Sequence, residues 1–191
     1  MSDRKRIVVG MSGASGAPLT IELLQVLRQT GCFETHLVLT EAARQSIPHE
    51  TDRTAEEICA LADVVHPLHA MDASIASGSF RCSGMIVAPC SMKTAAGIAC
   101  GYSENLLLRA ADVTIKERRP LVLLVRECPL SPIHLENLLK LARIGVWIVP
   151  MVMNYYSCPA DLTQMNCQLV GKLLAPFELH VSGFRHWGEQ E

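Results

Sequence analysis

The sequence is poor in charge, and the charges that it has nearly balance. Charged residues make up 19% of its 191 positions, against about 25% in a typical soluble domain, and the formal net charge is −2. The basic surface that a phosphate backbone requires is therefore missing, and we expect no nucleic-acid partner. A small domain with so little charge is also suited to bury part of its surface against other subunits.

Long apolar runs and paired cysteines are missing as well. No apolar run reaches about 18 residues, the length of a membrane-spanning helix, so we expect no membrane association. The apolar stretch behind the basic N-terminus is too short for a signal peptide. The eight cysteines include no C-x-x-C pair, and we interpret them as reduced thiols of a cytoplasmic protein. Neither they nor the seven histidines show the spacing of metal ligands, so no metal site is expected.

Strand signals alternate with helix signals along the whole chain. A hydrophobic content of 49% excludes disorder. Short apolar runs predict five buried parallel strands, at residues 7–11, 36–39, 85–88, 121–125 and 146–149. Helices are predicted at residues 18–30, 41–63 with an interruption near Pro48, 91–99, 105–117, 131–145 and 160–174. Residues 64–83 match neither pattern.

This alternation predicts a single α/β domain. We expect a doubly wound parallel sheet of five or six strands, flavodoxin-like (Rossmann-type), between two layers of helices. The length of the chain suits one such domain over residues 1–191. In these sheets ligands bind beyond the carboxyl ends of the strands. Glycines and polar residues gather there, which places the candidate site at that edge.

Two turns at that edge carry hydroxyl groups and open helices. The turn at residues 10–16 is neither G-x-G-x-x-G nor a Walker loop, yet the hydroxyls of Ser12 and Ser15 and the helix N-terminus offer donors to an anion. Residues 89–94 repeat the arrangement after the third strand. Tight packing in the first turn and an ordinary N-cap in the second are the alternatives. Cys90 is expected to be a buried thiol rather than a nucleophile.

Charged residues supply a second group of candidates. Arg126 and Glu127 follow the fourth strand, where an arginine suits a phosphate and a glutamate suits proton transfer; an ion pair between the two is the alternative. Arg109 and Lys116 lie two helical turns apart and share a face, which in most proteins is solvated. We expect the following pair, Arg118–Arg119, on a solvated face as well.

These motifs together resemble the flavin prenyltransferases of the UbiX/Pad1 type, in the branch of the phenolic-acid decarboxylase B subunits. The resemblance runs from about residue 6 to residue 188. The segments that carry it are Gly13–Ala17, Pro89–Ser91, Arg109–Val113, Lys116–Leu123, Arg126–Glu127, Ile133–Asn137, Tyr155–Tyr156 and Arg185–Gly188.

The resemblance implies an enzyme that joins a dimethylallyl group, from dimethylallyl phosphate, to N5 and C6 of reduced FMN without a metal. The prenylated FMN would serve a partner UbiD-type decarboxylase. The implied FMN contacts are Gly13, Ala14, Ser15, Thr40, Ser91, Met92, Lys93, Thr94 and Arg126. The implied donor contacts are Arg109, Lys116, Tyr156 and Lys172, with Trp187 lining or closing the pocket. The implied positions near the reacting atoms are Ser15, Glu50, Ser77 and Glu127, beside the catalytic cations Arg109 and Lys116.

The resemblance also implies a homododecamer built from trimers, with active sites between subunits. We expect the last helix and tail, about residues 160–191, to pack on a neighbouring subunit or to close the site. Two other functions remain open. An FMN-dependent cysteine decarboxylase of related fold would need a catalytic histidine soon after the first helix, for which His36 and His49 are poor candidates. A non-catalytic FMN-binding accessory subunit would have no use for Lys116, Arg126 and Glu127.

Overall fold

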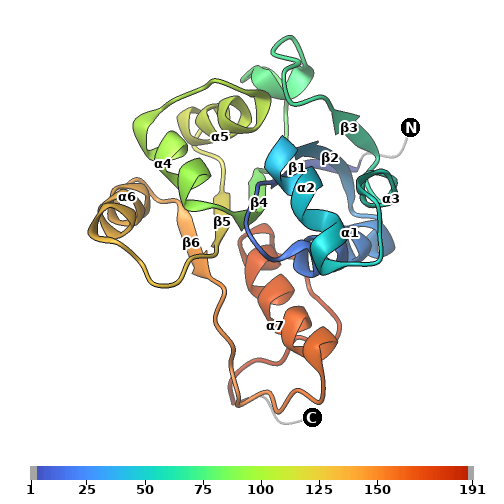
Figure 1. The fold of residues 1–191 in the computed structure, drawn as a ribbon. Coiled ribbons are helices and arrows are strands. Elements are labelled where there is room, and N and C mark those ends of the chain that lie inside the picture. Colours follow the sequence, from blue (N-terminus) through green and yellow to red (C-terminus); the bar gives the residue numbers. More distant parts are fainter. Residues whose placement is uncertain (1–3, 189–191) are drawn as a thin grey trace.

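The central feature of the structure, a computed structural model that describes residues 4–188, is one sheet of six parallel strands in the order β3-β2-β1-β4-β5-β6 (Figure 1). Without the short edge strand β3 the order is that of a flavodoxin-like sheet, and with β3 it is the Rossmann order. The predicted doubly wound sheet is confirmed. The strands are β1 (Lys5–Met11), β2 (Phe33–Leu39), β3 (Val64–His66), β4 (Met85–Cys90), β5 (Leu121–Val125) and β6 (Trp147–Pro150).

Helices cover both faces of this sheet, as the predicted three layers require. Alternate residues of a strand point to opposite faces, so Ile7 and Val9 of β1 belong to one buried cluster and Val8 to the other. The first cluster receives α1 (Ala17–Thr30), α2 (Glu41–Glu50), α3 (Ala55–Cys59) and α7 (Leu162–Leu174). The second receives α4 (Met92–Cys100), α5 (Leu106–Lys116), α6 (Pro132–Arg143) and the 3₁₀ turn η1 (Ser74–Ala76).

The predicted helix at residues 41–63 is wrong as one interrupted element. Helix α2 continues through Pro48, which lies in its last turn, where a missing N–H costs only one helical hydrogen bond. The helix ends when the N–H and hydroxyl of Thr51 donate to the Ile47 carbonyl, at 3.0 Å each. Helix α3 then begins at a capping box in which Thr54 and Glu57 exchange hydrogen bonds.

The segments around this helix pair also differ from the prediction. Strand β2 begins three residues earlier than expected, at Phe33, because polar partners accommodate its first residues: the Thr35 N–H donates to Asp63 at 2.8 Å. The unassigned residues 64–83 contain the three-residue strand β3 and the turn η1. Both are too short to produce a periodic pattern.

Helix α7 carries the C-terminal part of the chain, which projects from the body of the molecule (Figure 1). The tail folds back on α7, because Gln168 donates to the Gly183 carbonyl at 2.7 Å and accepts from the Arg185 N–H at 3.1 Å. Phe184 packs against Gly171, where a β-carbon would overlap its ring. The tail at residues 189–191 lies outside the described residues, and the packing of residues 160–191 on another subunit stays a prediction.

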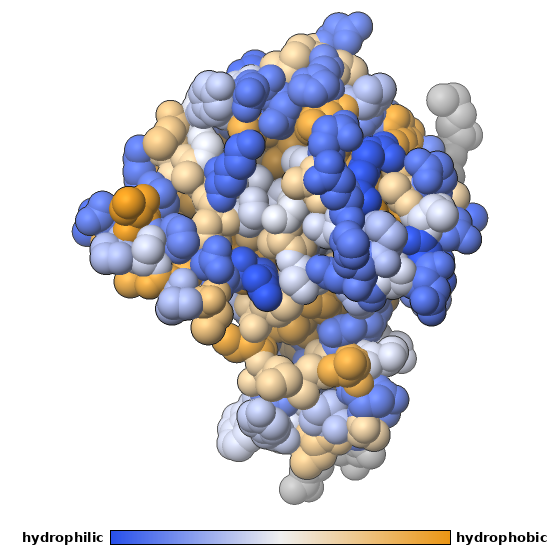
Figure 2. Space-filling view, viewed as in Figure 1, coloured by the Kyte–Doolittle hydropathy of each residue, from blue (hydrophilic) through white to orange (hydrophobic). Residues whose placement is uncertain are grey.

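Hydrophobic side chains reach the surface on two parts of the molecule. Over α6 and the start of β6 they are Ile133, Leu135, Leu139, Ile144 and Trp147, and on the projecting segment they are Val152, Met153, Tyr155 and Leu162. Figure 2 shows hydrophobic residues at the α6 edge and along the projecting segment. Within residues 4–188, no helix has the length and apolar character needed to cross a membrane.

Candidate functional site

A cavity of about 300 Å³ opens where β1 and β4 lie side by side. The connections after these strands leave toward opposite faces, so the crevice forms at the carboxyl edge, as expected for a doubly wound sheet. Five of the nine residues that the sequence assigned to FMN line it: Gly13, Thr40, Ser91, Lys93 and Thr94. The other four, Ala14, Ser15, Met92 and Arg126, lie on the adjoining loops and the first turn of α4.

The N-terminus of α4 forms one wall of this cavity. Ser91 is its N-cap, and the Ser91 hydroxyl accepts from the Thr94 N–H at 3.3 Å and donates to the Thr94 hydroxyl at 3.1 Å. The Ser91 N–H in turn donates to Ser12 Oγ at 2.8 Å, and Ser12 Oγ donates to the Pro89 carbonyl at 3.1 Å. Ser12 is only 1% exposed. Its predicted role as a ligand donor is wrong, because its hydroxyl ties the two loops together.

The N-terminus of α1 is closed to a ligand anion by the protein itself. Glu50 Oε2 accepts hydrogen bonds from the N–H groups of Gly16 (2.7 Å) and Ala17 (2.9 Å). These groups have no partner inside the helix, and a carboxylate there is stabilised by the helix dipole. The Gly16 N-cap contributes no side-chain cap of its own. The anion site at the first turn is therefore occupied by Glu50, which the sequence placed near the reacting atoms.

The residues around the cavity fit a flavin mononucleotide. Hydroxyls of Thr40, Ser91 and Thr94, the Lys93 ammonium and the α4 N-terminus supply donors and positive charge for a phosphate. Glu41 and Glu104, which also line the cavity, offer acceptors for sugar-type hydroxyls. Gly13 admits no side chain, because a β-carbon would overlap Ala42 of α2, so the first turn packs directly against α2 at the rim of the cavity.

The carboxyl end of β5 lies beside the carboxyl end of β4, with which it pairs in parallel. The Arg126 N–H donates to the Cys90 carbonyl at 3.2 Å, which places Arg126 and Glu127 next to the Ser91 loop. Within the described residues these two side chains form no ion pair, and Glu127 Oε1 accepts from the Cys128 N–H at 3.1 Å. Burial raises the pKa of the Cys90 thiol to about 12, which confirms an inert buried cysteine.

The predicted donor cations of α5 are not among the residues that line this cavity in the same protomer. Helix α5 runs back from the carboxyl edge, so Lys116 at its last turn lies at the edge where β4 and β5 begin. Lys116 forms an ion pair with Glu117, which lowers the pKa of that carboxyl. Arg109 donates to Asp112 at 2.7 Å and to the Ala76 carbonyl at 3.1 Å. Ser77, in the same segment, shares a 2.9 Å hydrogen bond with Ser79.

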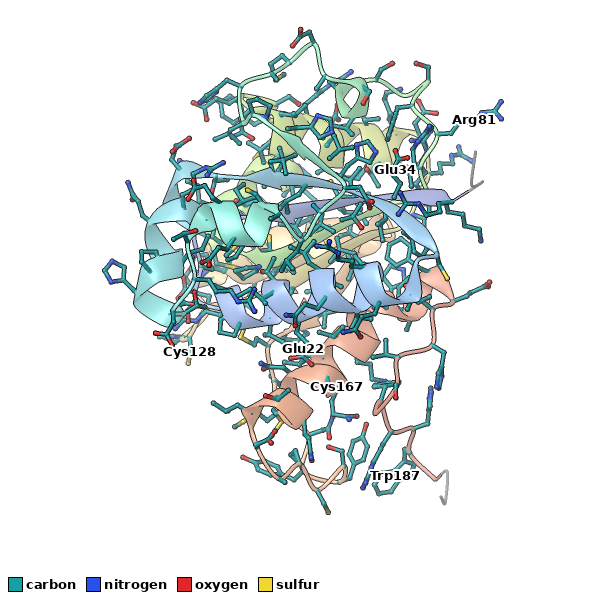
Figure 3. The ribbon with its side chains drawn as sticks, turned by 90° about the vertical axis from the view of Figure 1, so that its right-hand side faces the viewer. Glu22, Glu34, Arg81, Cys128, Cys167 and Trp187 are labelled. Atoms are coloured by element: carbon teal, nitrogen blue, oxygen red, sulfur yellow. The ribbon has the colours of Figure 1, made fainter. Side chains whose placement is uncertain are left out.

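The remaining predicted donor contacts form a third group, on the other face of the sheet. Tyr156 and Lys172 line a second cavity of about 400 Å³ between β6, the following loop and α7. Trp187 packs edge-on against Tyr156, with ring centroids 5.2 Å apart, and is 79% exposed at the far end of the tail (Figure 3). One protomer therefore keeps Arg109 and Lys116 apart from Tyr156 and Lys172.

Sequence reasoning missed two groups of polar residues. Arg119, expected on a solvated face, is half-buried and donates to the carbonyls of Gly78 (2.8 Å) and Phe80 (2.7 Å). His36 lies between Glu34 (2.8 Å) and His66 (2.9 Å) on neighbouring strands. Glu34 lies two residues before His36 on β2, but His66 and the carbonyls bound by Arg119 lie 30 or more residues away, so local spacing gave no signal for these contacts. Within residues 4–188, no three His, Cys, Asp or Glu side chains gather as metal ligands.

Comparison with known proteins gives consistent matches. The family model described as Flavoprotein matches residues 1–175. A probable UbiX-like flavin prenyltransferase of Streptomyces sp. strain D7 is 50% identical over 182 residues, which cover 95% of this chain and 91% of that protein.

Solved structures agree with this match over nearly the whole chain. The dodecameric FMN-dependent UbiX-like decarboxylase of Escherichia coli O157:H7 has a TM-score of 0.94 at 48% identity, covering 96% of this chain and 100% of that one. AnUbiX (PadA1) in complex with FMN and dimethylallyl pyrophosphate has a TM-score of 0.95 at 47% identity, covering 98% and 100%. The cysteine decarboxylase SpaF, at 17% identity and a TM-score of 0.63 over 86% of this chain and 97% of that one, shares the fold alone.

Proposed function

This chain belongs to the flavoprotein family as a UbiX-like flavin prenyltransferase, and we propose that it transfers a dimethylallyl group from dimethylallyl phosphate to N5 and C6 of reduced FMN. The observation that carries this proposal is the cavity at the carboxyl edge, lined by five of the residues expected to contact FMN. The alternatives, cysteine decarboxylation and non-catalytic FMN binding, leave the α5 cations without a role.

We assign the FMN site to the cavity between β1, β2 and β4. Ser91, Thr94 and Arg126 hold the phosphate, because the α1 N-terminus is already occupied by Glu50. Bound reduced FMN supplies two nucleophilic ring atoms, N5 and C6. Gly13 lets the first turn pack directly against α2 at the rim of the cavity, and Ser12 fixes the distance between the two loops beside it.

We assign the donor site to the contact between two subunits. Arg109 and Lys116 lie on a helix of one face, and Tyr156 and Lys172 lie beside the other. One dimethylallyl phosphate contacts both pairs when α5 of a second subunit lies against the cavity between β6 and α7 of the first. The exposed hydrophobic surfaces of α6 and of the projecting segment supply apolar area for such an assembly, for which we propose the dodecamer named for the E. coli relative.

The chemistry asks the protein to stabilise a leaving phosphate and to accept protons. Breaking the C–O bond of the donor leaves charge on the phosphate, and Lys116 and Arg109 stabilise that charge without a metal. Two protons must leave, one from N5 and one from C6, and one proton must add to the C=C bond of the dimethylallyl group so that its tertiary carbon can bond to C6. Ser15 and Glu127 accept the first, and the released phosphate accepts the second. Trp187 and Tyr156 exclude water and place aromatic faces near the allylic cation.

Subunit complementation tests the shared donor site. Lys116→Ala and Tyr156→Phe each remove one half of the site, and the activity of each should be strongly reduced. Oligomers reassembled from a mixture of the two should regain activity, because some contacts then join an intact Lys116 to an intact Tyr156. A mixture that stays as inactive as the separate variants would contradict a site between subunits.

The remaining parts of the proposal concern the surroundings of the reaction. The prenylated flavin leaves for a UbiD-type decarboxylase acting on an aromatic acid, the two proteins meet in the cytoplasm, and no metal takes part. Purified protein, reduced FMN and dimethylallyl phosphate should restore activity to such a decarboxylase freed of its cofactor. An inactive decarboxylase after this mixing would contradict the partnership.

A further inference from the structure

The segment Ala76–Phe80, which contains Ser77, is held against α5 by arginines. Arg109 donates from Nε to the Ala76 carbonyl at 3.1 Å. Arg119 follows α5 and donates from Nη2 to the Gly78 carbonyl at 2.8 Å and from Nη1 to the Phe80 carbonyl at 2.7 Å. Two arginines thus bind every second carbonyl of the segment.

The same segment lies directly on the ion pair at the end of α5. A β-carbon on Gly78 would fall 2.6 Å from the Lys116 ammonium and closer still to the Glu117 carboxylate. The backbone at Gly78 therefore limits where Lys116 can place its charge. Side chains of the segment are exposed around this contact: Ser77 and Ser79 are solvent-accessible, and Arg81 points outward (Figure 3).

We infer that Arg119 is a positioning residue that fixes Ser77 and Lys116 relative to each other for binding of the donor phosphate. The inference rests on the proposed function, because only that function gives Lys116 a phosphate to bind. An arginine suits the task, since its planar fork donates to two carbonyls at once, whereas a lysine ammonium is a point charge on a flexible stem. Arg119 does not itself touch the substrate in this account.

Steady-state kinetics on three variants tests the inference. Arg119→Gln removes the fork, Arg119→Lys keeps the charge, and Arg118→Gln changes the exposed neighbour as the matched control. With saturating reduced FMN, Arg119→Gln should raise KM for dimethylallyl phosphate about tenfold or more, as expected when charge-assisted hydrogen bonds are lost. The affinity for FMN should stay within about twofold of wild type. Arg119→Lys should fail to restore KM, and Arg118→Gln should behave as wild type.

A physical measurement accompanies the kinetics. Hydrogen–deuterium exchange of the peptide around residues 76–82 should accelerate in Arg119→Gln and not in Arg118→Gln. Gly78→Ala alters the same contact from the side of the segment and should raise KM for the donor as Arg119→Gln does, because its β-carbon displaces the Lys116 ammonium and the Glu117 carboxylate. It also serves if the Arg119 variants fail to fold.

Three results would overturn the inference. The first is unchanged KM in Arg119→Gln, whether or not exchange accelerates, and the second is wild-type KM in Arg119→Lys. The third is a parallel loss of FMN affinity, kcat and thermal stability, which marks a general structural role. If the wild-type protein makes no prenylated flavin, the proposed function fails and the inference with it. Accelerated exchange in Arg119→Gln would in that case still show that Arg119 stabilises the segment.

Discussion

Glu50 and Gly16 meet through a 2.7 Å hydrogen bond in which the Gly16 N–H donates to the Glu50 carboxylate. The contact joins the end of α2 to the start of α1 and places a negative charge at the turn after β1. That charge disfavours a second anion at the α1 N-terminus, and in our proposal the flavin phosphate therefore lies at the α4 N-terminus, where Ser91 is the N-cap. The hydrogen bonds from Gly16 and Ala17 also hold the Glu50 side chain at the carboxyl edge of the sheet, where the flavin binds in our proposal.

Removal of this carboxylate should destabilise the protein. Glu50→Ala leaves the N–H groups of Gly16 and Ala17 without an acceptor, and we expect the free energy of unfolding to fall by about 1–2 kcal/mol. Urea unfolding at one fixed protein concentration measures the loss. Glu56→Ala is the matched control, because the Glu56 side chain is 80% exposed. Equal stability of the two variants would contradict a capping role for Glu50.

Removal of the Lys116 charge should separate flavin binding from prenyl transfer. Lys116 lies at the opposite edge of the sheet from the FMN cavity, so Lys116→Ala should bind FMN as wild type does. Turnover at saturating donor should fall about a hundredfold, the cost of one charged donor to the leaving group. Arg53→Ala, at an exposed position, is the control for loss of a cation. Near-wild-type turnover in Lys116→Ala would refute the assignment.

Acid should destabilise the protein partly through His66. Burial, and then the charge of His36, lower the pKa of His66 from its ordinary 6.5. The unfolded chain therefore binds this proton more tightly than the folded one, so this contribution to stability is present above pH 6.5 and declines as the pH falls through the lowered pKa. The melting temperature should fall less between about pH 7.5 and pH 5 in His66→Gln than in wild type. Equal drops would show that His66 does not contribute.

The elements that the sequence predicted correctly are those whose signal is local. Apolar runs such as Leu121–Val125 became buried strands, and Ser131 with Pro132 caps α6 as expected. Arg119 escaped detection because its partners are backbone carbonyls about forty positions earlier in the chain, which leave no side-chain pattern. The capping role of Glu50 was hidden for the same reason.

The placement of the site residues was predictable only in part. Gly13, Thr40 and Ser91 follow strands that lie together in any doubly wound sheet, so their convergence follows from the order of the elements. Lys116 is the last residue of α5 and Lys172 lies in the last turn of α7, and these two helices cover opposite faces of the sheet. A contact of both with one donor depends on a second copy of the chain, which the order of elements within a single chain does not specify.

Substitution of Glu127 should block completion of the product without loss of FMN. Glu127 is exposed beside Arg126 at the end of β5, and within the described residues its carboxylate forms no ion pair. An amide of the same shape cannot accept the proton. Glu127→Gln should therefore bind FMN normally and stall with the dimethylallyl group bonded to one flavin atom. Formation of the four-ring flavin at the wild-type rate would remove Glu127 from the proton path.

The mass of the flavin is the most direct test of the central claim. Purified protein is incubated anaerobically with reduced FMN and dimethylallyl phosphate. The flavin is then released from the protein, and its mass is measured by mass spectrometry. A prenyltransferase adds one C₅H₈ unit to FMN and releases one phosphate for each flavin converted, and Lys116→Ala under the same conditions gives almost none of this product. Recovery of FMN with its mass unchanged from the wild-type protein would contradict the account.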